Sequence, residues 1–62
     1  MKKEELKKLR KQAFGSTPKK DVAKFAGVRT ETIWRWESGM IPESSTVFAT
    51  YVEFLKERIA NE

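Results

Sequence analysis

The chain has 62 residues, of which 35% are charged and 39% hydrophobic, and its formal net charge is +4. This length allows one domain, residues 1–62, with a small core, since such a domain buries only about 60% of its unfolded surface. The sequence has no cysteine and no histidine, which excludes disulfides, thiolate and imidazole metal sites, and an imidazole general base. We therefore expect no enzyme, no catalytic residues, no metal, no cofactor and no small-molecule substrate.

Positive charge is concentrated in the first part of the chain. Residues 1–24 carry nine Lys/Arg and three Asp/Glu residues, a net charge of +6, whereas residues 25–62 carry four and six, a net charge of −2. This asymmetry favours a basic face for a polyanion. A solvated lysine-rich helix explains the same pattern, so charge alone leaves both interpretations open.

No segment of the sequence is typical of a membrane span or an export signal. No apolar run approaches the roughly 18 residues that a membrane helix needs. The N-terminal MKKEELKKLRKQ is basic but leads into an amphipathic helix. We therefore expect a soluble, cytoplasmic protein with no membrane partner.

The first two predicted helices are separated by a glycine. The first covers residues 3–14, where four apolar residues recur at helical spacing. They are Leu6, Leu9, Ala13 and Phe14. Gly15 is predicted to end this helix, and the second covers about 18–26, with Thr17 or Ser16 as N-cap and Pro18 at the first helical position. Its predicted apolar stripe is Val22, Phe25 and Ala26, and Gly27 ends it.

The third predicted helix, about 30–38, contains two tryptophans two residues apart. Positions i and i+2 lie about 200° apart on a helix, so the two indoles cannot face the same core. Ile33 and Trp36 are three residues apart and form the inward pair. Trp34 is therefore expected on the outer side, beside Arg35.

The last predicted helix covers roughly 43–60, after an Ile41-Pro42 turn, and its apolar arc is wider than one core-facing stripe. The arc comprises Val47, Phe48, Tyr51, Val52, Phe54, Leu55 and Ile59. Either it caps the other three helices, or part of it forms a dimer contact. The candidates for that contact are Phe48, Tyr51, Phe54 and Leu55. With no strand pattern, the sequence predicts a compact all-α domain of four, or alternatively five, helices.

Residues 21–39, DVAKFAGVRTETIWRWESG, contain the main functional pattern. A small Ala23 lets the third helix approach the second, Gly27 permits a tight turn, and Val28 and Ile33 fill the angle between the helices. This segment resembles the helix-turn-helix of phage Cro and repressor proteins and their bacterial relatives. The likeness includes the glycine-apolar turn, the Ile-x-x-Trp-Glu-x-Gly segment and the downstream Ile-Pro, and it covers about residues 6–55.

The resemblance implies that the helix at 30–38 enters the major groove of DNA while the preceding helix lies across the backbone. The base-contacting residues carried over by position are Thr30, Glu31, Trp34 and Arg35. Arg35 is the candidate for bidentate contact with guanine, and Glu31 for accepting a hydrogen bond from cytosine. The helix dipole also favours an acidic residue in the first turn, which explains Glu31 without DNA.

Phosphate contacts are expected from the start of the second helix, from the turn, and from the segment after the third helix. They are Thr17, Lys19, Lys20, Arg29, Ser38 and Ser44, with Ser45 as an alternative to Ser44. Lys19 and Lys20 are also explained as exposed lysines without a ligand. In relatives, a basic residue on the first helix pairs with the glutamate that follows the tryptophan. Here this implies an ion pair between Arg10 and Glu37, with Lys11 as an alternative to Arg10.

Two positions depart from the family pattern. Arg29 stands where relatives have a serine or threonine cap, so capping is expected to shift to Thr30. Trp34 stands where a small or polar residue is usual. Its indole is expected to stack on DNA, to pack on the last helix, or to contact a partner subunit.

These features together predict sequence-specific binding of double-stranded DNA. The expected protein is a small transcriptional regulator, a repressor of Cro type, that binds a palindromic operator as a homodimer through its C-terminal helix. One alternative is a helical protein-interaction module in which Trp34 is a central contact. The other is a DNA-bending accessory factor of excisionase type, although no strand pair for a wing hairpin follows Gly39.

Overall fold

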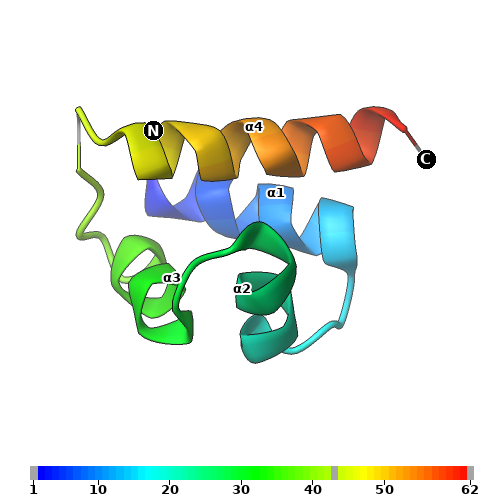
Figure 1. Cartoon of the computed structure of the whole chain (residues 1–62), viewed down its shortest axis with the longest axis horizontal. Coiled ribbons are helices and arrows are strands. Elements are labelled where there is room, and N and C mark those ends of the chain that lie inside the picture. Colours follow the sequence, from blue (N-terminus) through cyan, green and yellow to red (C-terminus); the bar gives the residue numbers. More distant parts are fainter. Residues whose placement is uncertain (1, 43, 62) are drawn as a thin grey trace.

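The computed structural model describes residues 2–42 and 44–61, and this part of the chain forms four helices (Figure 1). They are α1 (Lys3–Phe14), α2 (Lys19–Ala26), α3 (Thr30–Glu37) and α4 (Thr46–Ala60). No strand occurs among the described residues, so the predicted all-α class is confirmed, with four helices. In Figure 1, α4 runs along one side of α1, while α2 and α3 lie on the other side of it.

One hydrophobic core joins all four helices. Leu6 of α1, Val22 of α2, Ile33 of α3 and Leu55 of α4 each have an exposed fraction of 0%. The predicted inward pair of α3 is confirmed, because Trp36 is also buried, with the Phe48 ring edge-on to it at 5.0 Å. α3 is thereby packed against the first turn of α4. None of the described helices has the length and apolar character to cross a membrane.

The predicted apolar stripe of α2 is wrong at Phe25, which is 67% exposed. The buried residues of α2 are Val22 and Ala23, with Ala26 partly buried against the core. A helix of eight residues presents only one buried stripe to its neighbours. In α2 this stripe is centred on Ala23, whose small side chain lets α3 approach. Phe25 lies beside that stripe and stacks on the Phe14 ring at 6.2 Å.

The helix ends agree with the sequence in part. Gly15 and Gly27 follow α1 and α2 with φ of 63° and 75°, which is the left-handed region that favours glycine. The predicted caps of α2 and α3 are wrong. Pro18 precedes α2 without a side-chain cap, and Arg29 precedes α3 likewise, because Thr30 is already the first helical residue.

α4 begins later than predicted. The predicted start, residue 43, lies outside the described residues, and the first helical residue is Thr46. Ser45 is the N-cap, and its Oγ accepts a hydrogen bond from the Phe48 main-chain N–H at 3.2 Å. This is the serine cap that sequence favours at a helix start, one turn further along than expected.

Three of the four residues named for a dimer contact are part of the chain's own core. Phe48, Tyr51 and Leu55 have exposed fractions of 9%, 1% and 0%, so the fold leaves them no surface for a partner. Phe54 is half-buried, and Val47 is 55% exposed. The wide arc of α4 is therefore mostly explained as the cap over the other three helices.

Candidate functional site

The inner side of α3 is held by a buried ion pair to α1. Arg10 Nε donates to Glu37 Oε2 at 2.6 Å, and Arg10 Nη2 donates to Glu37 Oε1 at 3.2 Å. The two side chains are only 9% and 3% exposed. The pair implied by the resemblance is thus present, and Lys11, the alternative partner, is exposed instead. A bidentate arginine–carboxylate contact fixes orientation as well as distance, so it sets how α3 lies against α1.

Tyr51 of α4 completes this inner side. Its ring lies 5.2 Å from the Trp36 ring, and its Oη is buried without a hydrogen-bond partner among the described residues. Burial and, after it, the negative charge of Glu37 raise the pKa of Tyr51 to about 12, while the positive charge of Arg10 opposes them. The phenol is therefore neutral at physiological pH and adds no charge beside the ion pair.

The outer side of α3 forms an exposed surface with the first turn of α2. Trp34 is 62% exposed, and Glu31 and Arg35 beside it are exposed as well. Lys19 of α2 places its Nζ 5.5 Å from the centre of the Trp34 ring. We call Lys19, Thr30, Glu31, Trp34 and Arg35 the outer surface of α3. Lys19 and Thr30 are half-buried, and the other three are exposed.

The exposure of Trp34 rules out one of the three expected positions of its indole, which is packing on the last helix. Trp34 is absent from the residues that form the core or pack against it, whereas Trp36 belongs to the core. The indole therefore does not pack on α4. Its observed neighbour is the ammonium of the half-buried Lys19, and the indole itself remains accessible to a ligand.

The expected phosphate contacts divide into two groups. Lys20, Arg29 and Ser44 are exposed, so their donors are accessible. In contrast, Thr17 Oγ1 donates to the Phe14 carbonyl at 2.7 Å, and Ser38 Oγ donates to the Arg35 carbonyl at 2.8 Å. Phosphate oxygens only accept hydrogen bonds, so the hydroxyl protons of Thr17 and Ser38 are already used within the chain.

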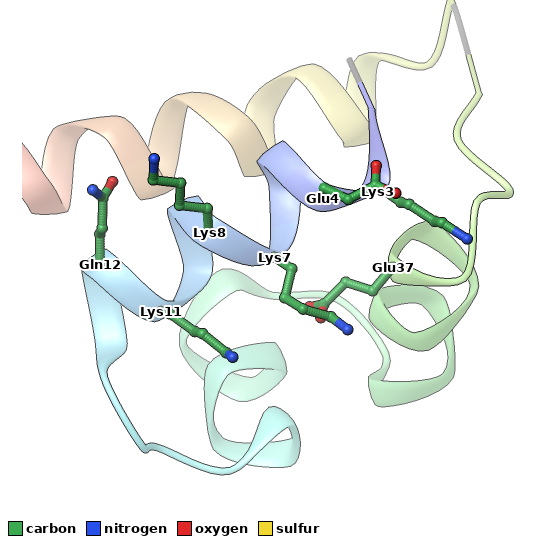
Figure 2. Close-up of a pocket in the computed structure, with 7 residues that line it drawn as sticks. All are labelled: Lys3, Glu4, Lys7, Lys8, Lys11, Gln12 and Glu37. Carbon is green, nitrogen blue, oxygen red and sulfur yellow. The ribbon is translucent and has the colours of Figure 1, made fainter.

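A second basic surface lies on α1 and was not among the predicted site residues. Figure 2 shows a hollow next to α1 that is lined mainly by lysines of this helix, together with Glu37 of α3. The signal was present in the sequence, because Lys3, Lys7 and Lys11 are spaced four residues apart and share one side of a helix. The sequence alone did not show which way that side faces.

The described residues do not bring potential metal ligands together. They contain no group of three or more acidic side chains placed to hold a metal ion. Comparisons with protein-family models, with curated proteins and with solved structures found no match for this chain. The arrangement of α3 and the charges around it are therefore the basis for a functional proposal.

Proposed function

We propose that this chain binds double-stranded DNA sequence-specifically, with α3 in the major groove, and acts as a small transcriptional regulator. The observation that supports this is the division of α3 into two sides. Ile33, Trp36 and Glu37 hold its inner side in the core, while Glu31, Trp34 and Arg35 remain exposed. A short helix that is held rigidly and presents polar side chains outward suits the width of the major groove.

Each residue of the outer surface has a definite role in this proposal. Arg35 donates two hydrogen bonds to a guanine, which is the commonest specific contact in the major groove. Glu31 accepts from a cytosine amino group, and the methyl group of Thr30 packs on a thymine methyl. Trp34 packs flat against a sugar edge or a thymine methyl, since its indole is exposed and unattached to the core.

Phosphate contacts in the proposal come from the cationic residues around α3. Lys19, Lys20 and Arg29 each neutralise a phosphate, and Ser44 donates one neutral hydrogen bond. Thr17 and Ser38 are left out because their hydroxyl protons are engaged within the chain. Three neutralised phosphates for each bound copy give a log–log dependence of affinity on salt with a slope of about −3 per copy, or about −5 to −6 for a dimer on both half-sites.

The proposal includes a homodimer on a palindromic operator, with one α3 in each half-site. In such complexes the half-sites lie about 34–36 Å apart, which is one turn of DNA. The accessible apolar side chains of α4, Val47 and Phe54, are the positions left for contact between two copies.

The first experiment is selection of bound sequences from a random pool of DNA duplexes. Enrichment of one consensus would establish specificity, and a symmetric consensus would establish binding by two copies together. Repeating the selection with Arg35→Ala tests the assignment. That variant should lose about 1–3 kcal/mol of discrimination at one base pair per half-site, whereas Lys19→Ala should weaken all sequences about equally.

A protein-interaction module is the second candidate, and the exposure of Trp34 is what favours it, since tryptophan is enriched in protein hot spots. The two functions differ in their response to salt and to DNA. A folded protein that binds no duplex at low salt would exclude the DNA proposal. Retention of sequence preference by Arg35→Ala would show that the base-contacting residues are wrongly assigned.

A further inference from the structure

The hollow beside α1 is strongly basic. Its charged lining residues are Lys3, Glu4, Lys7, Lys8, Lys11 and Glu37. The Glu37 carboxylate is bound by Arg10, so Glu4 is the one lining carboxylate that no arginine neutralises. Four lysines therefore stand against one glutamate, which leaves the hollow with excess positive charge.

The lysines of α1 do not all point the same way. In Figure 2, the side chains of Lys3, Lys7 and Lys11 extend from α1 toward the side where α2 and α3 lie. Lys8 extends toward the opposite side of α1. We call Lys3, Lys7 and Lys11 the α1 lysine track. Its direction places it on the same half of the molecule as the two helices of the proposed DNA interface.

In the part of the chain that the structure describes, the lysines of the track form no ion pair. Among the described residues, the ion pair within contact distance is that of Arg10 and Glu37, and no carboxylate pairs with a lysine of the track. Like charges four residues apart on a helix destabilise it. A run of three such lysines is therefore unfavourable for the isolated helix and becomes favourable when a polyanion lies along it.

The length of the track fits a phosphate backbone. Residues four apart on a helix are separated by about 6 Å along its axis, so the track from Lys3 to Lys11 spans about 12 Å. Phosphates of one DNA strand follow each other every 3.4 Å or so along the duplex axis. Because the strand runs obliquely to that axis, its phosphates are farther apart along the strand, and the track is long enough to meet about two or three of them.

We propose that the α1 lysine track binds the phosphate backbone of DNA beyond the base pairs that α3 reads. This inference rests on the proposed function, because it assumes that a duplex lies against α3. The track is a second electrostatic contact, independent of base sequence, that lengthens the DNA site and raises its affinity. With Lys3, Lys7 and Lys11 added to the three cations around α3, the log–log salt slope for each bound copy becomes about −5 to −6 rather than about −3.

The test compares two double variants that lose the same charge. Lys7→Gln with Lys11→Gln removes two members of the track, and Lys8→Gln with Lys56→Gln removes two lysines outside it. All four side chains are exposed, so both variants should keep the wild-type circular dichroism spectrum and thermal unfolding midpoint. Binding of each to the selected duplex is measured by fluorescence anisotropy from about 50 to 200 mM salt.

For each bound copy, the track variant should show a salt slope about 1.8 less steep than wild type, at about 0.9 for each phosphate that a lysine no longer neutralises. From 50 to 200 mM salt, wild type would then lose about tenfold more affinity per bound copy than the track variant, or on the order of a hundredfold more for a dimer. The variant with Lys8 and Lys56 replaced should keep nearly the wild-type slope. A duplex shortened to the base pairs that α3 contacts should abolish the difference between the track variant and wild type.

Equal slopes for the two double variants would overturn the inference, because net charge alone would then explain the effect. An unchanged slope in the track variant, with sequence-specific binding intact, would overturn it too and leave the proposed function standing. Absence of duplex binding by the folded wild type would instead exclude the proposed function. A difference that persists unchanged on the shortest duplex would place the track against the base pairs of the core site and contradict the proposal of flanking contacts.

Discussion

The two sides of α3 differ in what holds their side chains. On the inner side, Ile33 and Trp36 are buried and Glu37 is bound by Arg10 through two hydrogen bonds. On the outer side, Trp34 is 62% exposed and has the Lys19 ammonium of α2 at 5.5 Å from its ring centre. The same residue type, two positions apart, thus has a structural role on one side and a free surface on the other. Within the eight residues of α3, one side stabilises the fold and the other side is available for binding.

The two tryptophans offer the largest test of this comparison. Trp36→Ala should reduce the free energy of unfolding by about 3–5 kcal/mol, because it empties a site filled by a large buried ring. That decrease is comparable to the whole stability of a domain of this size. Trp34→Ala should change it by no more than about 0.5 kcal/mol. Urea unfolding followed by circular dichroism measures both, and equal decreases would contradict the assignment of the two sides.

The ion pair offers a second test of similar size. Arg10→Met should lower the free energy of unfolding by about 3–5 kcal/mol, since it leaves the Glu37 carboxylate buried without its partner. Replacing both residues, Arg10→Met with Glu37→Met, should recover most of this decrease because no charge then remains buried. If urea unfolding shows the double variant to be no more stable than Arg10→Met, the decrease in unfolding free energy caused by Arg10→Met comes from lost packing and not from the unpaired charge.

Removing the Lys19 cation from the outer side of α3 should change the unfolding free energy far less than removing Arg10 from the inner side. Lys19→Met removes the ammonium over the Trp34 ring and should cost about 0.5–1 kcal/mol of unfolding free energy. Lys20→Met, at the exposed neighbouring position, is the matched control and should cost less. In a Trp34→Ala background the cost of Lys19→Met should disappear. Persistence of the full cost in that background would show that Lys19 acts through something other than the indole.

The smallest effect at neutral pH is expected from Tyr51→Phe. The buried hydroxyl has no partner among the described residues, so its removal should leave the unfolding free energy unchanged or slightly higher. At alkaline pH the variants should diverge. The pKa of Tyr51 is about 12 in the folded protein against 10.0 for a free phenol, so the unfolded state loses its proton first. Wild type should therefore lose stability from about pH 10 to 12 more steeply than Tyr51→Phe.

Urea unfolding of both proteins across this pH range measures that difference. Tyr51 is the only tyrosine in the chain, so absorbance of its phenolate gives the folded pKa directly. Parallel stability curves for the two proteins would contradict a raised pKa. An absorbance midpoint near that of a free phenol would contradict it independently.

Much of α1 and α3 followed from the sequence, because their periodicity is unambiguous. The bounds of α1 were predicted as observed, and the inward pair of α3 required only the 200° separation of Trp34 from Trp36. Predictions were weaker for α2. Two turns of helix contain too few apolar residues to fix the direction of the buried stripe, so Phe25 was placed inside although it is exposed.

Helix ends and hydroxyl contacts also depended on the fold. α4 starts at Thr46 because Ser45, and not an earlier residue, caps its main chain. Thr17 and Ser38 were predicted to donate to phosphate, but each donates to a carbonyl three residues earlier in the chain. Such local bonds compete with a ligand for the same proton and cannot be inferred from residue type alone.

The sequence by itself determined the helical class, the excess of charge in the first part of the chain, and the opposition of the two tryptophans. These properties follow from composition and from the fixed geometry of a helix. Only the tertiary structure placed Lys19 over Trp34, turned the α1 lysine track toward the side of α2 and α3, and buried most of the α4 arc. Each of these depends on how separate helices pack, and packing is set by contacts between residues far apart in the chain.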